Sequence, residues 1–68
     1  MEIKINGKDV QLKEAITIEE LLVSQKVEMP QYVTVQLNDE FLERASFPAT
    51  LVQEGDTVEF LYFMGGGQ

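Results

Sequence analysis

The residues with the clearest chemical potential in this sequence are three consecutive glycines, Gly65 to Gly67, followed by Gln68. Glycine has no Cβ atom, so these residues cannot extend a packed core and instead form a thin tail. A tail of four residues reaches at most about 13 Å beyond the last strand residue. Such a tail can enter a narrow channel in a partner protein, where no side chain shields its carboxyl carbon. Frayed glycines are also common at chain ends, so the rest of the chain must decide between the two readings.

The composition excludes most other kinds of chemistry. The chain contains no cysteine and no histidine. It therefore lacks disulfides, thiolate metal sites, cysteine nucleophiles and the commonest general base. A chain of 68 residues forms one domain, close to the smallest size that is stable without disulfides or structural metal ions. Such a domain has no room for an enclosed enzyme pocket. Any chemistry must use carboxylates or the chain termini.

The charge balance indicates the kind of partner. Twelve acidic and five basic residues give a net charge of -7, which repels nucleic acid and anionic membranes and favours a basic protein partner. No apolar run approaches the roughly 20 residues of a membrane span, and the N-terminus lacks the apolar region of a signal peptide. We expect a soluble, cytoplasmic protein that binds neither nucleic acid nor membrane.

The first half of the chain predicts a hairpin and a helix. Residues 2–5 and 9–12 alternate apolar with polar side chains around Asn6-Gly7, which suits a two-residue turn with positive φ angles. The apolar set faces the core: Ile3, Ile5, Val10 and Leu12. Three apolar residues then follow at helical spacing: Ile18, Leu21 and Leu22. Thr17 and Glu20 form a capping box at the helix start, and the helix ends near Gln25 or Lys26, before Pro30.

The second half predicts strands joined by short turns. Residues 32–37 alternate as a third strand, Asn38-Asp39 form a turn, and residues 40–44 form a short fourth strand. A loop around Phe47-Pro48 follows, and Leu51 and Val52 fill the core. A turn at residues 54–56 leads into the longest strand, residues 57–63.

The order of these elements predicts an α+β fold, a mixed sheet of four to five strands with one main helix packed on one face. The first and last strands are expected to lie side by side and parallel in the centre of the sheet. We expect a domain over residues 1–64 and a flexible tail over residues 65–68. One helix covers only one face, so Leu61 and Phe63 of the last strand, together with Met64, are expected to form an apolar docking patch beside the tail.

Five segments, taken together and in order, resemble the ThiS-type sulfur carriers of the ubiquitin-like β-grasp group over essentially the whole chain. They are Ile5-Asn6-Gly7-Lys8, Thr17-Ile18 with Leu21-Leu22, Val35-Gln36-Leu37-Asn38-Asp39-Glu40, Glu54-Gly55-Asp56-Thr57-Val58-Glu59, and Phe63-Met64-Gly65-Gly66-Gly67. Each segment alone is weak evidence for the family; a Gly-Asp turn before an apolar strand, for example, is widespread among proteins.

The resemblance implies a protein co-substrate and not an enzyme. Gly67 would be adenylylated by an activating enzyme that uses ATP and then converted to a thiocarboxylate, with sulfur from a donor such as a cysteine desulfurase. The chain itself would bind no cofactor. A synthase such as thiazole synthase, in thiamine biosynthesis, would accept the sulfur. The apolar pattern of the last strand and the position of the glycines predict partner contacts at Leu61, Phe63, Met64, Gly65 and Gly66.

The sequence departs from the family pattern because Gln68 follows Gly67. Some similar carriers need a peptidase to remove extra residues, and these include carriers for methionine or cysteine synthesis; other relatives serve molybdopterin synthesis. Two further interpretations stay open. A regulatory or adaptor β-grasp module would not need a free glycine tail. A protein modifier would use the same activation, but its C-terminal carboxyl group would be joined to lysine side chains.

Overall fold

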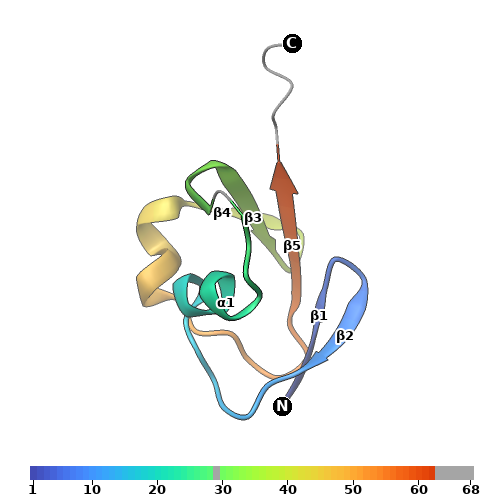
Figure 1. Ribbon diagram of the computed structural model, residues 1–68. Coiled ribbons are helices and arrows are strands. Elements are labelled where there is room, and N and C mark those ends of the chain that lie inside the picture. The colour runs from blue at the N-terminus through green and yellow to red at the C-terminus, as the bar shows by residue number, and fades with distance from the viewer. Residues whose placement is uncertain (29, 63–68) are drawn as a thin grey trace.

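The strands of this protein form a single sheet with β5 at its centre. The computed structural model describes residues 1–28 and 30–62, apart from the side chain of Tyr62. The elements run in the order β1 (Glu2–Ile5), β2 (Lys8–Gln11), α1 (Ile18–Ser24), η1 (Pro30–Tyr32), β3 (Val33–Leu37), β4 (Glu40–Leu42), η2 (Arg44–Ala49) and β5 (Thr57–Tyr62), where η marks a 3-10 helix. The strand order across the sheet is β2-β1-β5-β3-β4. Figure 1 shows β5 between the β1–β2 hairpin and β3.

The two outermost strands in sequence are neighbours in space, as the element order predicts. β1 pairs with β5 in parallel, with Lys4 opposite Thr57 and Ile5 opposite Val58. On its other side β5 pairs antiparallel with β3 over residues 58–62, from Leu37 opposite Val58 to Val33 opposite Tyr62. β5 is therefore held on both sides at its start, before the chain continues toward the glycines.

The local signals at the hairpin and the helix are confirmed. Asn6 and Gly7 have φ angles of 51° and 84°, the left-handed region that their turn requires. Thr17 Oγ1 accepts from the Glu20 amide at 3.1 Å, and Glu20 Oε1 accepts from the Thr17 amide at 2.9 Å. These two bonds form the capping box. The helix caps at Gln25, and Lys26 follows with a φ of 56°.

The hydrophobic core lies between the sheet and the layer formed by α1 and η2. Figure 1 shows α1 and η2 together on one side of the sheet. The helix contributes its apolar stripe, and the strands contribute every second residue. The buried residues are Ile3, Ile5, Ile18, Leu21, Leu22, Val33, Val35, Phe47, Val52, Val58 and Phe60. Val10 and Leu12 are partly buried against this cluster. Among the described residues, no helix combines the length and apolar character needed to cross a membrane.

Three expectations for the segment before β5 are corrected. The fourth strand ends at Leu42 instead of Arg44, and the expected loop is η2, which carries Phe47 into the core at 4% exposure. Leu51 does not fill the core, because its side chain is 53% exposed while Val52 is fully buried. Leu51 bridges Thr17 in an extended pairing. Successive side chains alternate in such a pairing, so only one of the two neighbours can point inward.

Candidate functional site

Strand β5 is fixed at its start by a set of bonds around Asn38. The Asn38 amide donates to the Thr57 carbonyl at 2.7 Å, and the Thr57 amide donates to Asn38 Oδ1 at 2.9 Å. Asn38 Nδ2 also donates to Asp56 Oδ1 at 3.0 Å. Asn38 has a φ of 53°, a conformation that asparagine tolerates better than most residues. The turn between β3 and β4 thus anchors the strand that leads to the glycine tail.

Leu61 is the one predicted site residue in the described part of the chain. Its neighbour Phe60 is buried in the core, so Leu61 points to the opposite face of the sheet, the face that α1 leaves uncovered. Leu61 is half-buried there and lies opposite Thr34. The predicted patch therefore has its first member in place. Phe63, Met64, Gly65, Gly66 and Gly67 lie outside the described residues, as does the expected domain boundary at residue 64, and these predictions stay predictions.

Phe41 shares the uncovered face and was missed by the sequence reasoning. Gln36 lies opposite Phe41 on one side and opposite Glu59 on the other, so all three side chains project from the same face. Phe41 is 65% exposed. The alternation of the short strand β4 carries the signal, because Leu42 packs against the core and its neighbour Phe41 must then face outward. We call Leu61 and Phe41 the open-face patch.

The part of the open face farther from the tail is charged. Lys4 lies opposite Asp9 across the β1–β2 pair, and Lys4 Nζ donates to Asp9 Oδ1 at 2.7 Å. This hydrogen bond, together with the charge of Asp9, raises the pKa of Lys4. Both side chains are more than half exposed, so the pair adds little to stability. The face thus changes from charged at the hairpin to partly apolar near the end of β5.

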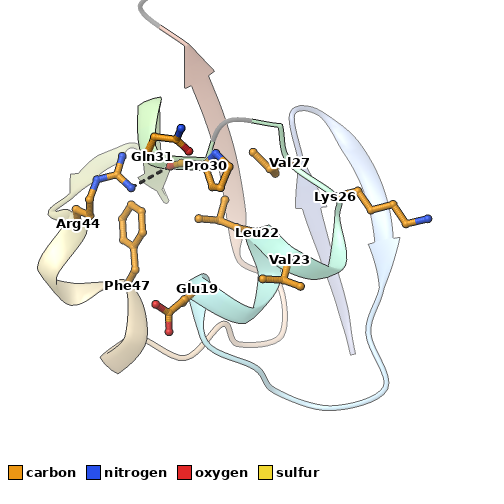
Figure 2. A pocket seen from close by; sticks show the side chains of 9 residues that line it. All are labelled: Glu19, Leu22, Val23, Lys26, Val27, Pro30, Gln31, Arg44 and Phe47. Atoms are coloured by element: carbon orange, nitrogen blue, oxygen red, sulfur yellow. Dashed lines mark hydrogen bonds between the residues drawn. The ribbon is translucent and has the colours of Figure 1, made fainter.

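A groove of about 590 Å³ lies on the helical side of the molecule, between α1, η1 and η2. Figure 2 shows the Arg44 guanidinium above the Phe47 ring, 5.3 Å from its centre. Arg44 Nη1 donates to the Pro30 carbonyl at 2.9 Å, and Nη2 donates to the Val33 carbonyl at 2.8 Å. Arg44 therefore fastens η2 to the start of β3, and we assign it a structural role.

Nothing in the described residues supports catalysis or metal binding at that groove. Of the described residues, Glu19 alone brings a carboxylate to the groove lining, so this part of the chain supplies no second carboxylate there for paired acid–base chemistry. Within residues 1–28 and 30–62, no group of three or more acidic side chains is arranged to hold a metal ion.

Comparisons with known proteins agree with these features. A family model described as ThiS family matches residues 3–67. The sulfur carrier protein ThiS of Bacillus subtilis is 33% identical over 66 residues, which cover 96% of this chain and 98% of that protein. A thiazole synthase of Magnetococcus marinus is 34% identical over 68 residues, but the chain spans only 21% of that enzyme's length.

A solved structure shares the fold. The crystal structure of the thiamine biosynthesis protein ThiS from Geobacter metallireducens superposes with a TM-score of 0.91 at 52% identity, and the match covers 98% of this chain and all of that one. The five-stranded mixed sheet with one main helix confirms the expected α+β, β-grasp architecture. From the family match along nearly its whole length and from this shared fold, the chain belongs to the ThiS family.

Proposed function

We propose that this chain is a sulfur carrier of thiamine biosynthesis and that it carries sulfur as a thiocarboxylate on Gly67. The observation that carries the proposal is the extent of the family match, which runs through the glycines and ends at Gly67. These glycines follow β5, the central strand of the sheet. The absence of cysteine in the sequence leaves the carboxyl group as the natural attachment point, since a persulfide needs a thiol.

The chemistry requires activation of the carboxylate. A carboxylate oxygen of Gly67 attacks the α-phosphorus of ATP, which forms an acyl adenylate and releases pyrophosphate. The outer sulfur of a persulfide on the donor then attacks the carbonyl carbon, and AMP leaves as that carbon–oxygen bond breaks. A thiol of a partner protein next attacks the acyl disulfide, which breaks the sulfur–sulfur bond, releases the thiocarboxylate and leaves a disulfide on the partner side. ATP is in this account a substrate of the activating enzyme. The chain contributes the carboxylate, and Gly65 and Gly66, which have no side chains, allow this carboxylate to pass through a narrow channel.

The proposed partners are an activating enzyme, a sulfur donor such as a cysteine desulfurase, and thiazole synthase as the acceptor. Support for the acceptor comes from the thiazole synthases of Magnetococcus marinus and Paramagnetospirillum magneticum, because a region of each resembles this chain over nearly its whole length. Since ATP and the reduced sulfur donor are cytoplasmic, we place the reaction in the cytoplasm.

The proposal also requires a processing step at Gln68. In the sequence, the carboxyl group of Gly67 is bonded to Gln68 and cannot attack ATP. A peptidase must therefore cut between these residues, and chain termini rich in small residues are substrates that peptidases accept readily.

The direct test is the intact mass of a chain that ends at Gly67. After incubation with its activating enzyme, a sulfur donor and ATP, we expect a gain of about 16 Da, the replacement of one carboxyl oxygen by sulfur. A reaction without ATP is the control and should leave the mass unchanged. An unchanged mass in the complete reaction would contradict the carrier role and favour a regulatory module, while adducts on lysine side chains would indicate a protein modifier.

The open-face patch gives a second expectation about the partners. Replacing Leu61 and Phe41 together by serine is expected to weaken binding of the activating enzyme about tenfold or more, because buried apolar anchors dominate interface energies. The matched control is Val23→Ser. Val23 is 75% exposed on α1, on the other side of the molecule, so its replacement should leave the affinity unchanged. Calorimetric titration of all three proteins measures the effect; equal affinities would remove the patch from the interface.

A further inference from the structure

The last part of β5 has a strand on only one side. On the β1 side, the pairing stops at Ile5 opposite Val58, because β1 then turns away at Asn6-Gly7. On the β3 side, the pairing continues to Val33 opposite Tyr62. In Figure 1, β5 extends past the turn of the β1–β2 hairpin. Within the described residues, one edge of β5 is therefore uncovered after Val58.

The hydrogen bonds along this edge end at Asn6. The Asn6 amide donates to the Val58 carbonyl at 2.9 Å, and the Phe60 amide donates to Asn6 Oδ1 at 2.9 Å. The amide and carbonyl of one strand residue point to the same edge, and this direction alternates along the strand. The Phe60 carbonyl and both backbone groups of Tyr62 therefore point to the uncovered edge. Within residues 1–28 and 30–62, no group bonds to them there.

On the other side of the sheet, where β4 ends before β3 does, a side chain bonds to the backbone group that is left without a strand partner. β4 ends at Leu42, opposite Val35, which leaves the Val33 carbonyl beyond the end of that strand. Arg44 Nη2 reaches this carbonyl at 2.8 Å and completes the bonding there. The described residues also contain no buried side-chain nitrogen or oxygen without a partner. The edge strands β2 and β4 also have a partner on one side only, but the unpaired groups of Phe60 and Tyr62 lie on the central strand that leads to the glycines.

We propose that this edge, formed by the Phe60 carbonyl and the Tyr62 amide and carbonyl, accepts an extended segment of the protein that receives the tail. The segment would add to the sheet as a further strand beside β5, a recognition mode in which backbone hydrogen bonds supply the affinity. This inference rests on the proposed function. The argument for this partner is that the edge is continuous with the tail. Residues 60–62 form the edge, and the residues that follow them directly are the ones proposed to enter the partner.

The added strand would also control the direction of the tail. A strand paired with residues 60–62 runs along β5 and can continue beside the residues that follow. This pairing would fix the path of Gly65 to Gly67 before their carboxylate reaches the reaction centre. The other side of β5 is already held by β3 up to Tyr62, so the partner strand would complete a sheet in which β5 is bonded on both edges.

A second copy of this chain fits the edge less well than a different protein. Each copy carries a net charge of -7, and like charges oppose close approach. Two copies would share only the few bonds that these backbone groups offer, against the large entropic cost of association. A carrier-binding enzyme can add contacts to the tail and to the open-face patch, so it does not depend on the edge alone.

The experiment compares Tyr62→Pro with Tyr62→Ala in binding to purified thiazole synthase and, separately, to the activating enzyme. Both changes remove the same side chain, but only proline removes the amide hydrogen. That amide points away from β3, so proline here leaves the β3–β5 bonds intact, as at other edge positions. We expect the proline variant to bind at least one of the two enzymes about tenfold more weakly than the alanine variant, the effect of one interfacial hydrogen bond.

A second measurement keeps the inference testable if proline disturbs the fold. Hydrogen exchange of the unaltered chain, followed by NMR, should show that the Tyr62 amide becomes protected when the enzyme binds. Equal binding by the two variants, or an amide that still exchanges freely in the complex, would overturn the strand pairing but leave the carrier role intact. Failure of the otherwise unaltered chain that ends at Gly67 to bind either enzyme would instead contradict the proposed function. A dimer of the unaltered chain that Tyr62→Pro dissociates would assign the edge to a second copy.

Discussion

A chain that ends at Gly67 is expected to support ATP–pyrophosphate exchange with the activating enzyme at least about a hundredfold faster than the chain that ends at Gln68. The extra residue moves the free carboxylate about 3.5 Å along the tail. A displacement of only about 1 Å can cost a hundredfold in rate. The glutamine side chain would also have to enter a channel that fits glycine. The match to the family model, which ends at Gly67, supports this expectation.

The control for this comparison is the mass of each chain after the reaction. The longer chain must still carry its glutamine, because a peptidase in the preparation would otherwise create the shorter chain. Equal exchange by both chains, with Gln68 still present, would mean that glutamine itself serves as the terminal acyl group. The processing step would then be wrong, while a carrier role could still hold.

Leu21→Ala is expected to remove most of the stability of the folded domain. Leu21 is fully buried at 0% exposure, where α1 packs on the sheet. Replacing a buried leucine by alanine typically costs about 2–5 kcal/mol of unfolding free energy. A domain of this size has a total of only about 5 kcal/mol. The variant should therefore lose its cooperative transition or unfold at a much lower urea concentration.

The matched control is Val23→Ala, two residues farther along the same helix. Val23 is 75% exposed, and alanine favours helix more than valine does, so the free energy of unfolding should change by less than about 0.5 kcal/mol. Circular dichroism during urea unfolding measures both variants. Similar unfolding midpoints for Leu21→Ala and the unaltered chain would show that α1 does not hold the sheet in the way that the buried side chains indicate.

The position of β5 links this stability to the proposed function. β5 begins at the bonds of Asn38 and lies between β1 and β3, so the strand that leads to the glycines is part of the centre of the sheet. The core of the domain thereby fixes the point at which the chain continues toward the glycines. Loss of the core would release that point, which is why we expect Leu21→Ala to reduce carrier activity together with stability.

The sequence by itself determined the features whose causes lie within a few residues. Asn6-Gly7 specified the hairpin turn, and Thr17 with Glu20 specified the helix start, because these interactions span at most three positions. The element order also predicted the parallel neighbours β1 and β5, since a single short helix leaves few ways to build one sheet. The glycines, as residue types without side chains, indicated the candidate site directly.

Only the tertiary structure decided the features that depend on where strands end relative to one another. The outward side chain of Leu51 follows from its bridge to Thr17, and the exposure of Phe41 follows from the pairing of β4 with β3. Arg44 reaches the Val33 carbonyl, and Asn6 reaches the Phe60 amide, across 11 and 54 residues of sequence. No local pattern encodes such contacts, because they exist only when a neighbouring strand stops short. For the same reason, the uncovered edge of β5 could not be predicted: it arises because β1 ends at Ile5 while β5 continues to Tyr62.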